Sequence, residues 1–250
     1  MADPDRLDRL ERPERVDRIA PTRRPDGRPQ GFQRWTRLAF LHWPVPVEAV
    51  RPLVPAELEL DLHDGVLWVG VVPFLMEGVR PWRIWPKSLA FRFLETNLRT
   101  YVVHRGEPGV WFFSLEAASW LAVQAARLGW GLPYHHARMA ETPEGDATHY
   151  TTTRRSGAGL DLTYRVTTER GPSKPGTLEF FLFERYLLFS QHRGRIMRGQ
   201  VHHVPYPVWD AEVLGCTESL FAAAGLPPVA GPPPLAHFSP GVDVEIFPLK

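Results

Sequence analysis

A single cysteine, Cys216, occurs among the 250 residues, so no disulfide can form within the chain. This excludes a secreted scaffold held together by disulfides, and a lone thiol fits the reducing cytoplasm, where we expect the protein to reside. No run of residues approaches the ~20 apolar positions of a membrane-spanning helix. No apolar segment follows the charged N-terminus either, so we expect neither membrane association nor a secretory signal peptide.

An excess of charge is also missing, because 29 Lys and Arg residues stand against 28 Asp and Glu residues. A net charge of +1 gives no overall field that would attract nucleic acid. The sequence contains no CxxC, no HExxH, no glycine-rich phosphate loop and no GxSxG elbow. We therefore expect no metal and no cofactor, and the oligomeric state stays open.

Residues 1–30 have few large apolar side chains and mix eight arginines with seven acidic residues. Such a segment cannot bury enough surface to offset the entropy that its ordering would cost. The sequence predicts a disordered or loosely attached charged tail at 1–30. A single domain at 31–250 follows, since β-rich domains often reach this length.

Short apolar and aromatic runs separated by Pro and Gly dominate the body and are typical of strands and turns. We expect a hairpin over 59–76 with Asp64-Gly65 at its turn, and a second hairpin in which 106–109 joins 91–103 to 110–115. Helices are expected at 119–128, at 178–184 and from Thr217, an N-cap candidate, to Ala224. Further strands are expected at 148–155, 160–167, 185–190, 196–204 and 242–247. The fold class is therefore α+β with strands in the majority.

Polar side chains alternate along the strand at 91–103. A period of two places Glu95, Asn97, Arg99 and Tyr101 on one face. A strand that shows its wet side to solvent would have the same pattern. The mixture of carboxylate, carboxamide, guanidinium and phenol instead favours a site for a small polar ligand.

Histidines occur as adjacent pairs, at 135–136 and at 202–203. Adjacent residues of a strand point to opposite faces, so one histidine of each pair at most belongs to a given site. Glu184-Arg185 lies in an apolar run. It can be an internal ion pair that orients the fold or a second side of the ligand site.

Several runs together resemble the YqjF-like family of uncharacterised bacterial proteins. That family is grouped with the acetoacetate-decarboxylase-like superfamily, which implies a curved antiparallel sheet or barrel around a central cavity, with a few short helices. The match covers roughly 32 to 215. It is carried by the runs at 42–46 (HWPVP), 53–55 (LVP), 65–74 (GVLWVGVVPF), 95–102 (ETNLRTYV), 109–115 (GVWFFSL), 132–134 (LPY) and 184–186 (ERY).

The resemblance implies roles for individual residues. Glu95 matches the catalytic glutamate of acetoacetate decarboxylases and Arg127 their arginine, whereas Tyr134 and His135 stand where that enzyme has two lysines. Schiff-base chemistry needs a primary amine, which neither residue supplies. The only lysines are Lys87, Lys174 and Lys250, and none lies in the matching motif. The decarboxylase activity is therefore not carried over.

We thus expect a cavity for a small keto or hydroxy acid. Arg99 would bind its carboxylate, with Asn97, Tyr101 and Arg127 as further ligand-binding residues, and Glu95, Tyr134 and His135 as the catalytic candidates. Whether the site turns its ligand over, as a lyase, hydratase or isomerase, or only binds it is left open. The alternative is a structural or protein-interaction domain that uses the nine tryptophans as a surface.

Overall fold

The computed structural model describes residues 16–80, 90–120, 123 and 131–250, and strands make up most of its regular structure. The helical elements are short: η1 (Ala20–Thr22), α2 (Val47–Val50), η2 (Arg51–Leu53), α4 (Leu178–Phe183) and α5 (Leu220–Ala223). The strands are β1 (Gly31–Pro44), β2 (Glu59–Leu60), β3 (Trp68–Arg80), β4 (Phe91–His104), β5 (Glu107–Ala117), β6 (Tyr134–Glu144), β7 (Ala147–Arg154), β8 (Gly159–Pro172), β9 (Leu187–His192), β10 (Arg195–His202), β11 (Pro207–Glu218) and β12 (Leu235–Ile246). The predicted β-rich α+β fold is confirmed.

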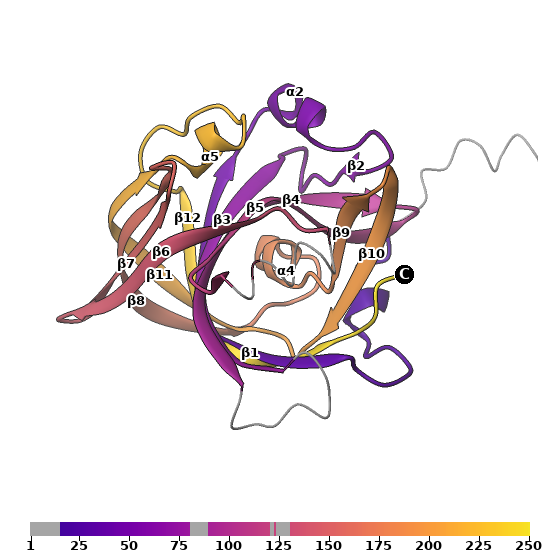
Figure 1. Cartoon of the computed structure of the whole chain (residues 1–250), viewed down its shortest axis with the longest axis horizontal. Coiled ribbons are helices and arrows are strands. Elements are labelled where there is room, and N and C mark those ends of the chain that lie inside the picture. The colour runs from indigo at the N-terminus through magenta and orange to yellow at the C-terminus, as the bar shows by residue number, and fades with distance from the viewer. Residues whose placement is uncertain (1–15, 81–89, 121–122, 124–130) are drawn as a thin grey trace, which may run out of the picture.

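The strands form one curved sheet that closes on itself (Figure 1). Antiparallel pairs link β12, β1, β3, β4 and β5 in turn. A short parallel pair then joins β5 to β9, and β10 leads from β9 back to β12. These seven strands form a closed ring, and Figure 1 shows α4 within its outline. The curved sheet around a central space agrees with the expected architecture.

The central strands are continuous apolar runs, without alternation of apolar and polar residues, because a hydrophobic core packs on each of their two faces. One core lies inside the ring and includes Phe40, Phe74 and Phe183. The other lies on the far side of β1, β3 and β4, where Leu41 and Leu98 pack with residues of β7, β8 and α5. Strands covered on both faces need apolar side chains at successive positions, as β3 has from Val69 to Met76.

The second expected hairpin forms, although its turn lies at 105–106 and residues 107–109 already belong to β5, whereas the first forms only at its turn. Arg105 and Gly106, both at positive φ, join β4 to β5. Asp64 and Gly65 likewise adopt positive φ, and two hydrogen bonds link His63 and Val66 across the turn. However, the short β2 before this turn pairs with β4 and not with β3. The sequence predicts the Asp-Gly turn because a turn depends on adjacent residues alone. Which strand pairs with β2 depends on the arrangement of the whole sheet.

The helix at 178–184 is confirmed as α4, with Thr177 as its N-cap. The expected helix from Thr217 begins later, because 217 and 218 still belong to β11 and Ser219 precedes α5. Of the helix expected at 119–128, residues 121–122 and 124–130 lie outside the described residues. The strands β1, β6 and β11 were not predicted. In the described part of the chain no helix has the length and apolarity to cross a membrane.

The segment before β1 belongs to the tail at 1–30 that the sequence predicted to be disordered or loosely attached. Residues 16–30 contact the body at a few points, with Pro21 and Pro29 buried and most of the others exposed, and residues 1–15 lie outside the described part. Arg18 binds Asp61 with two hydrogen bonds of 2.7 and 2.6 Å. The Gln30 amide donates to the Ile246 carbonyl at 2.7 Å. Arg18 thus has a buried ion-pair partner, Asp61, which lies 43 positions further along the chain. This contact attaches part of a segment whose polar composition predicted disorder.

Candidate functional site

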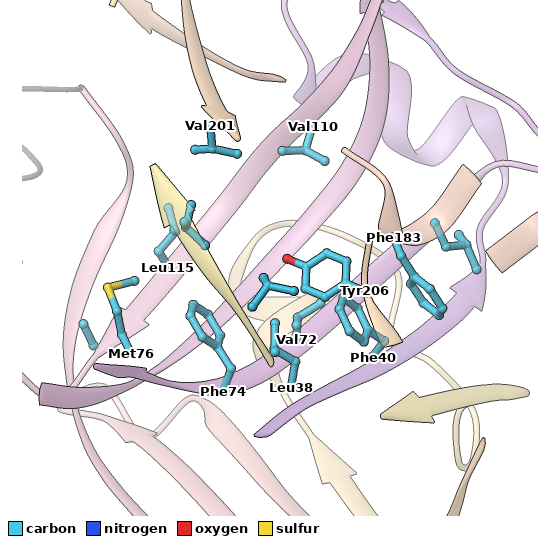
Figure 2. Packing of buried hydrophobic residues seen from close by; sticks show 14 of the residues in the cluster. Leu38, Phe40, Val72, Phe74, Met76, Val110, Leu115, Phe183, Val201 and Tyr206 are labelled. Atoms are coloured by element: carbon cyan, nitrogen blue, oxygen red, sulfur yellow. The ribbon is translucent and has the colours of Figure 1, made fainter. Parts of the chain in front are cut away.

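A cavity of about 170 Å³ lies inside the ring of strands. Since ~10–15 Å³ is enough for one water, this space can hold a small organic molecule. Most of the wall is apolar and aromatic, and Figure 2 shows part of it. The labelled residues of Figure 2 that line the cavity are Leu38, Val72, Phe74, Met76, Val110, Leu115, Phe183, Val201 and Tyr206.

A row of polar side chains on β4 interrupts this apolar wall. Glu95, Asn97 and Arg99 all line the cavity, as their alternation along a strand requires. Tyr101 continues the row on the same face but is not among the lining residues. Its ring is fully buried and its hydroxyl donates to the Leu182 carbonyl at 2.9 Å, so the structure gives it a supporting position.

Glu95 and Tyr134 form a buried pair. The Tyr134 hydroxyl donates to Glu95 Oε2 at 2.9 Å, and the Glu95 residue is 2 % exposed. Tyr134 reaches this place because β6 pairs in parallel with β5, with Tyr134 opposite Leu115. Leu115 in turn lies opposite Asn97 of β4. The structure thus brings together two residues that a hairpin and further chain separate in sequence.

Burial changes the protonation of this pair. It raises the pKa of Glu95 from 4.5 to about 8, against the smaller opposing effect of the Tyr134 hydrogen bond. Burial and the neighbouring carboxyl likewise raise the pKa of Tyr134 well above its usual value. At neutral pH Glu95 therefore carries a proton that it can donate, and Tyr134 remains a hydrogen-bond donor.

Arg99 supplies positive charge to the same cavity. One of its N–H groups donates to the Leu182 carbonyl at 3.0 Å, and its guanidinium lies 5.7 Å from the Phe40 ring. Among the residues that the structure describes, no carboxylate lies within ion-pair distance of Arg99. Beside it, the buried Asn97 Oδ1 has no hydrogen-bond partner in the same set of residues. Both groups are available to a ligand.

Another predicted site residue, His135, does not join this group. His135 follows Tyr134 on β6, so its side chain points to the other side of the strand, and it does not line the cavity. Adjacent residues of a strand point to opposite faces, so Tyr134 and His135 cannot both belong to the site, just as two adjacent histidines cannot. Arg127 lies outside the described residues.

Glu184 and Arg185 do not form the internal ion pair that was one of the two expectations. Each belongs to a separate network. Glu184 accepts hydrogen bonds from Ser173, the Tyr186 hydroxyl and the Tyr206 amide. Arg185 instead pairs with Asp61 at 2.8 Å and lines the cavity. Neighbours in sequence point apart here, and the partner of each lies elsewhere in the fold.

Several cavity residues were not predicted from the sequence. Trp35, Tyr186 and Tyr206 line the wall, and Asp61 connects it to Arg18 through Arg185. The aromatic residues occur in ordinary apolar runs, and no local pattern distinguishes them from core positions. Of the histidines at 202–203, His203 is buried and stacks on Tyr186 with ring centroids 4.4 Å apart.

Lysine is not among the described residues that line the cavity. Lys174 and Lys250 lie elsewhere, and Lys87 lies outside the described residues. In the described part of the chain no three His, Cys, Asp or Glu side chains are grouped to hold a metal. The polar chemistry of the cavity therefore rests on a carboxylic acid, phenols, amides and guanidinium groups.

The fold is that of the acetoacetate-decarboxylase-like proteins. Over 90% of this chain and 91% of the other, the enduracididine biosynthesis enzyme MppR complexed with pyruvate superposes with a TM-score of 0.63 at 11% identity. Acetoacetate decarboxylase from Legionella pneumophila gives 0.56 at 13% identity, over 90% and 88% of the two chains. An acetoacetate-decarboxylase-like enzyme from Sphingomonas wittichii RW1 gives 0.58 at 12% identity, over 90% and 93%. At such identities the likeness concerns the fold alone.

Within this fold, the chain belongs to the DUF2071 family, described as an uncharacterized conserved protein, whose model matches residues 32–243. The protein YqjF of Bacillus subtilis (strain 168) is 35% identical over 228 residues, which cover 90% of this chain and 94% of the relative. The resemblance inferred from short sequence runs is confirmed.

Proposed function

We propose that the cavity binds a small organic acid of the keto or hydroxy class, and that Glu95 and Tyr134 exchange a proton with it without a Schiff base. The observation that carries the proposal is the pairing of two features in one cavity. One is a guanidinium, that of Arg99, with no carboxylate partner among the described residues, and the other is a protonated buried acid. An anionic ligand that presents an oxygen to an acid satisfies both.

Arg99 binds the carboxylate in this proposal. A guanidinium presents parallel N–H donors that match the two oxygens of a carboxylate, and exclusion of water strengthens such a pair. One N–H already holds the Leu182 carbonyl at 3.0 Å, which fixes the orientation of the group before a ligand arrives. Binding then costs little side-chain entropy.

Glu95 acts as general acid, because a carboxyl with a pKa of about 8 is protonated at neutral pH. It donates its proton to a carbonyl or hydroxyl oxygen of the ligand, and the resulting carboxylate keeps the hydrogen bond from Tyr134. Reactions of the lyase, hydratase or isomerase type proceed by such steps. The pyruvate bound to MppR, a protein of the same fold, supports the choice of ligand class.

A thermal-shift screen tests the binding half of the proposal. Small keto and hydroxy acids are compared with their primary amides, which keep the shape but lack the charge. At one hundred times its Kd, an acid should stabilise the protein by ~2.7 kcal/mol, while its amide should have little effect. If the acid and its amide stabilised the protein equally, the negative charge would not contribute to binding. Arg99 would then not be the group that binds the ligand.

The catalytic half needs a separate readout. With any acid that is turned over, Glu95→Gln should abolish turnover while the acid still binds, because glutamine keeps the shape and the Tyr134 hydrogen bond but has no transferable proton. Glu59→Gln, on the exposed short strand β2, is the matched control. Undiminished turnover by Glu95→Gln would show that the acid is not Glu95.

A further inference from the structure

The acid and the cation lie far apart along the cavity. Glu95 and Arg99 are four residues apart on β4, which pairs with β3 without a register shift from Leu94 to Thr100. The strand is therefore extended over this stretch. At ~3.4 Å per residue, the two Cα atoms are about 14 Å apart.

The guanidinium of Arg99 lies near the rings of Phe40 and Tyr101. Its central carbon lies 5.8 Å from the ring of Tyr101, which is the next residue on this face in the direction away from Glu95. The Arg99 guanidinium and the Tyr101 hydroxyl donate to the same Leu182 carbonyl, at 3.0 and 2.9 Å. At the other end, Tyr134 holds the Glu95 carboxyl. The two polar ends of the cavity are thus on the order of 10 Å apart.

On β3, β4 and β5 the wall between these ends is apolar except for one amide, while Tyr186 and Tyr206 line the cavity from other segments. Val72 and Leu115 lie opposite Asn97 on its two neighbouring strands, and both line the cavity. Phe74 lies opposite Glu95 in the same way. A ligand that touches both polar ends therefore passes a mainly hydrophobic section of β3, β4 and β5, in which Asn97 is the polar side chain.

We infer that the ligand is an elongated acid whose carboxylate and whose carbonyl or hydroxyl are separated by about two to four methylene groups. This inference rests on the proposed function. Hydrogen bonds of ~2.8 Å at each end leave about 4–5 Å or more for the ligand to span. An acid with adjacent carboxylate and carbonyl, such as pyruvate, reaches one end only. A longer acid places its chain against Val72, Phe74 and Leu115.

A homologous series of methyl-ketone acids tests this inference by calorimetric titration at neutral pH. From pyruvate through levulinate to its next two homologues, affinity should rise about fourfold for each methylene buried, until the chain exceeds the span. Levulinate should also bind more tightly than pentanoate, which has the same length but no carbonyl.

A variant locates the carbonyl. In Glu95→Leu the preference for levulinate over pentanoate should vanish, whereas Glu59→Leu, at an exposed position of β2, should keep it. The contrary result is that affinity falls with chain length from pyruvate onward while Arg99→Ala still abolishes binding. That result would overturn the inference of an elongated ligand and leave the proposed acid site intact. Failure of every acid in the series to bind would overturn both.

Discussion

Replacement of Glu95 by glutamine tests whether this carboxyl is held protonated by burial. In the folded protein its pKa is about 8, against 4.5 for an unperturbed glutamate. Glutamine has nearly the same shape, still accepts the hydrogen bond from Tyr134 and cannot ionise. Any pH dependence that distinguishes the two proteins therefore belongs to Glu95.

The sign and size of the effect follow from the two pKa values. Below pH 4.5 the carboxyl is protonated in both the folded and the unfolded chain, so ionisation of Glu95 costs the folded state nothing. Between about pH 5 and pH 8 only the unfolded chain ionises, and the folded state loses ~1.4 kcal/mol per pH unit. The whole interval corresponds to roughly 4 to 5 kcal/mol, a large part of the ~5–15 kcal/mol by which proteins are stable.

Urea unfolding of both proteins at intervals from pH 5 to pH 9 measures this effect. The free energy of unfolding of the wild type, minus that of Glu95→Gln, should fall steadily up to pH 8 and then level off. Other buried carboxyls that do not interact with Glu95, such as Glu184, titrate in both proteins and cancel in the difference. A difference that stays constant over this range would refute the raised pKa and, with it, the role of Glu95 as a proton donor.

Three further predictions test other parts of the structure. Tyr134→Phe removes the hydrogen bond that lowers the pKa of Glu95, so the levelling-off described above should move to higher pH in pH-dependent urea unfolding. Arg18→Ala should cost about 1 kcal/mol and lower the Tm by ~2–4 °C in calorimetry, because Asp61 keeps only Arg185, whereas Arg28→Ala at an exposed position should change nothing. Incubation with acetoacetate and borohydride should leave the mass of the protein unchanged, and an adduct on Lys87 would overturn the absence of Schiff-base chemistry.

The sequence predicted the part of the site that depends on local geometry. The alternation of Glu95, Asn97 and Arg99 follows from the period of a strand, and all three line the cavity. Tyr134 could be placed beside them only through the family resemblance, because the parallel pair of β5 and β6 that brings it there has no local signal. His135 was placed in the site by the same resemblance, against the alternation that turns it away.

What failed depended on contacts between distant parts of the chain. Arg18 and Arg185 both form ion pairs with Asp61, and Arg185 does not pair with its sequence neighbour Glu184. Ring closure through the pairs of β9 with β5 and of β10 with β12 involves only two aligned residues on each strand. Composition and periodicity describe a residue's own segment. They do not describe which partner the fold brings to it.

The central claim is that the cavity binds a carboxylate at Arg99. A crystal structure of the protein with the tightest-binding acid of the series tests this most directly. The account predicts a carboxylate whose oxygens lie ~2.7–2.9 Å from the guanidinium nitrogens of Arg99, inside the ring of strands. A carboxylate bound outside the cavity, or inside it with no contact to Arg99, would contradict the account.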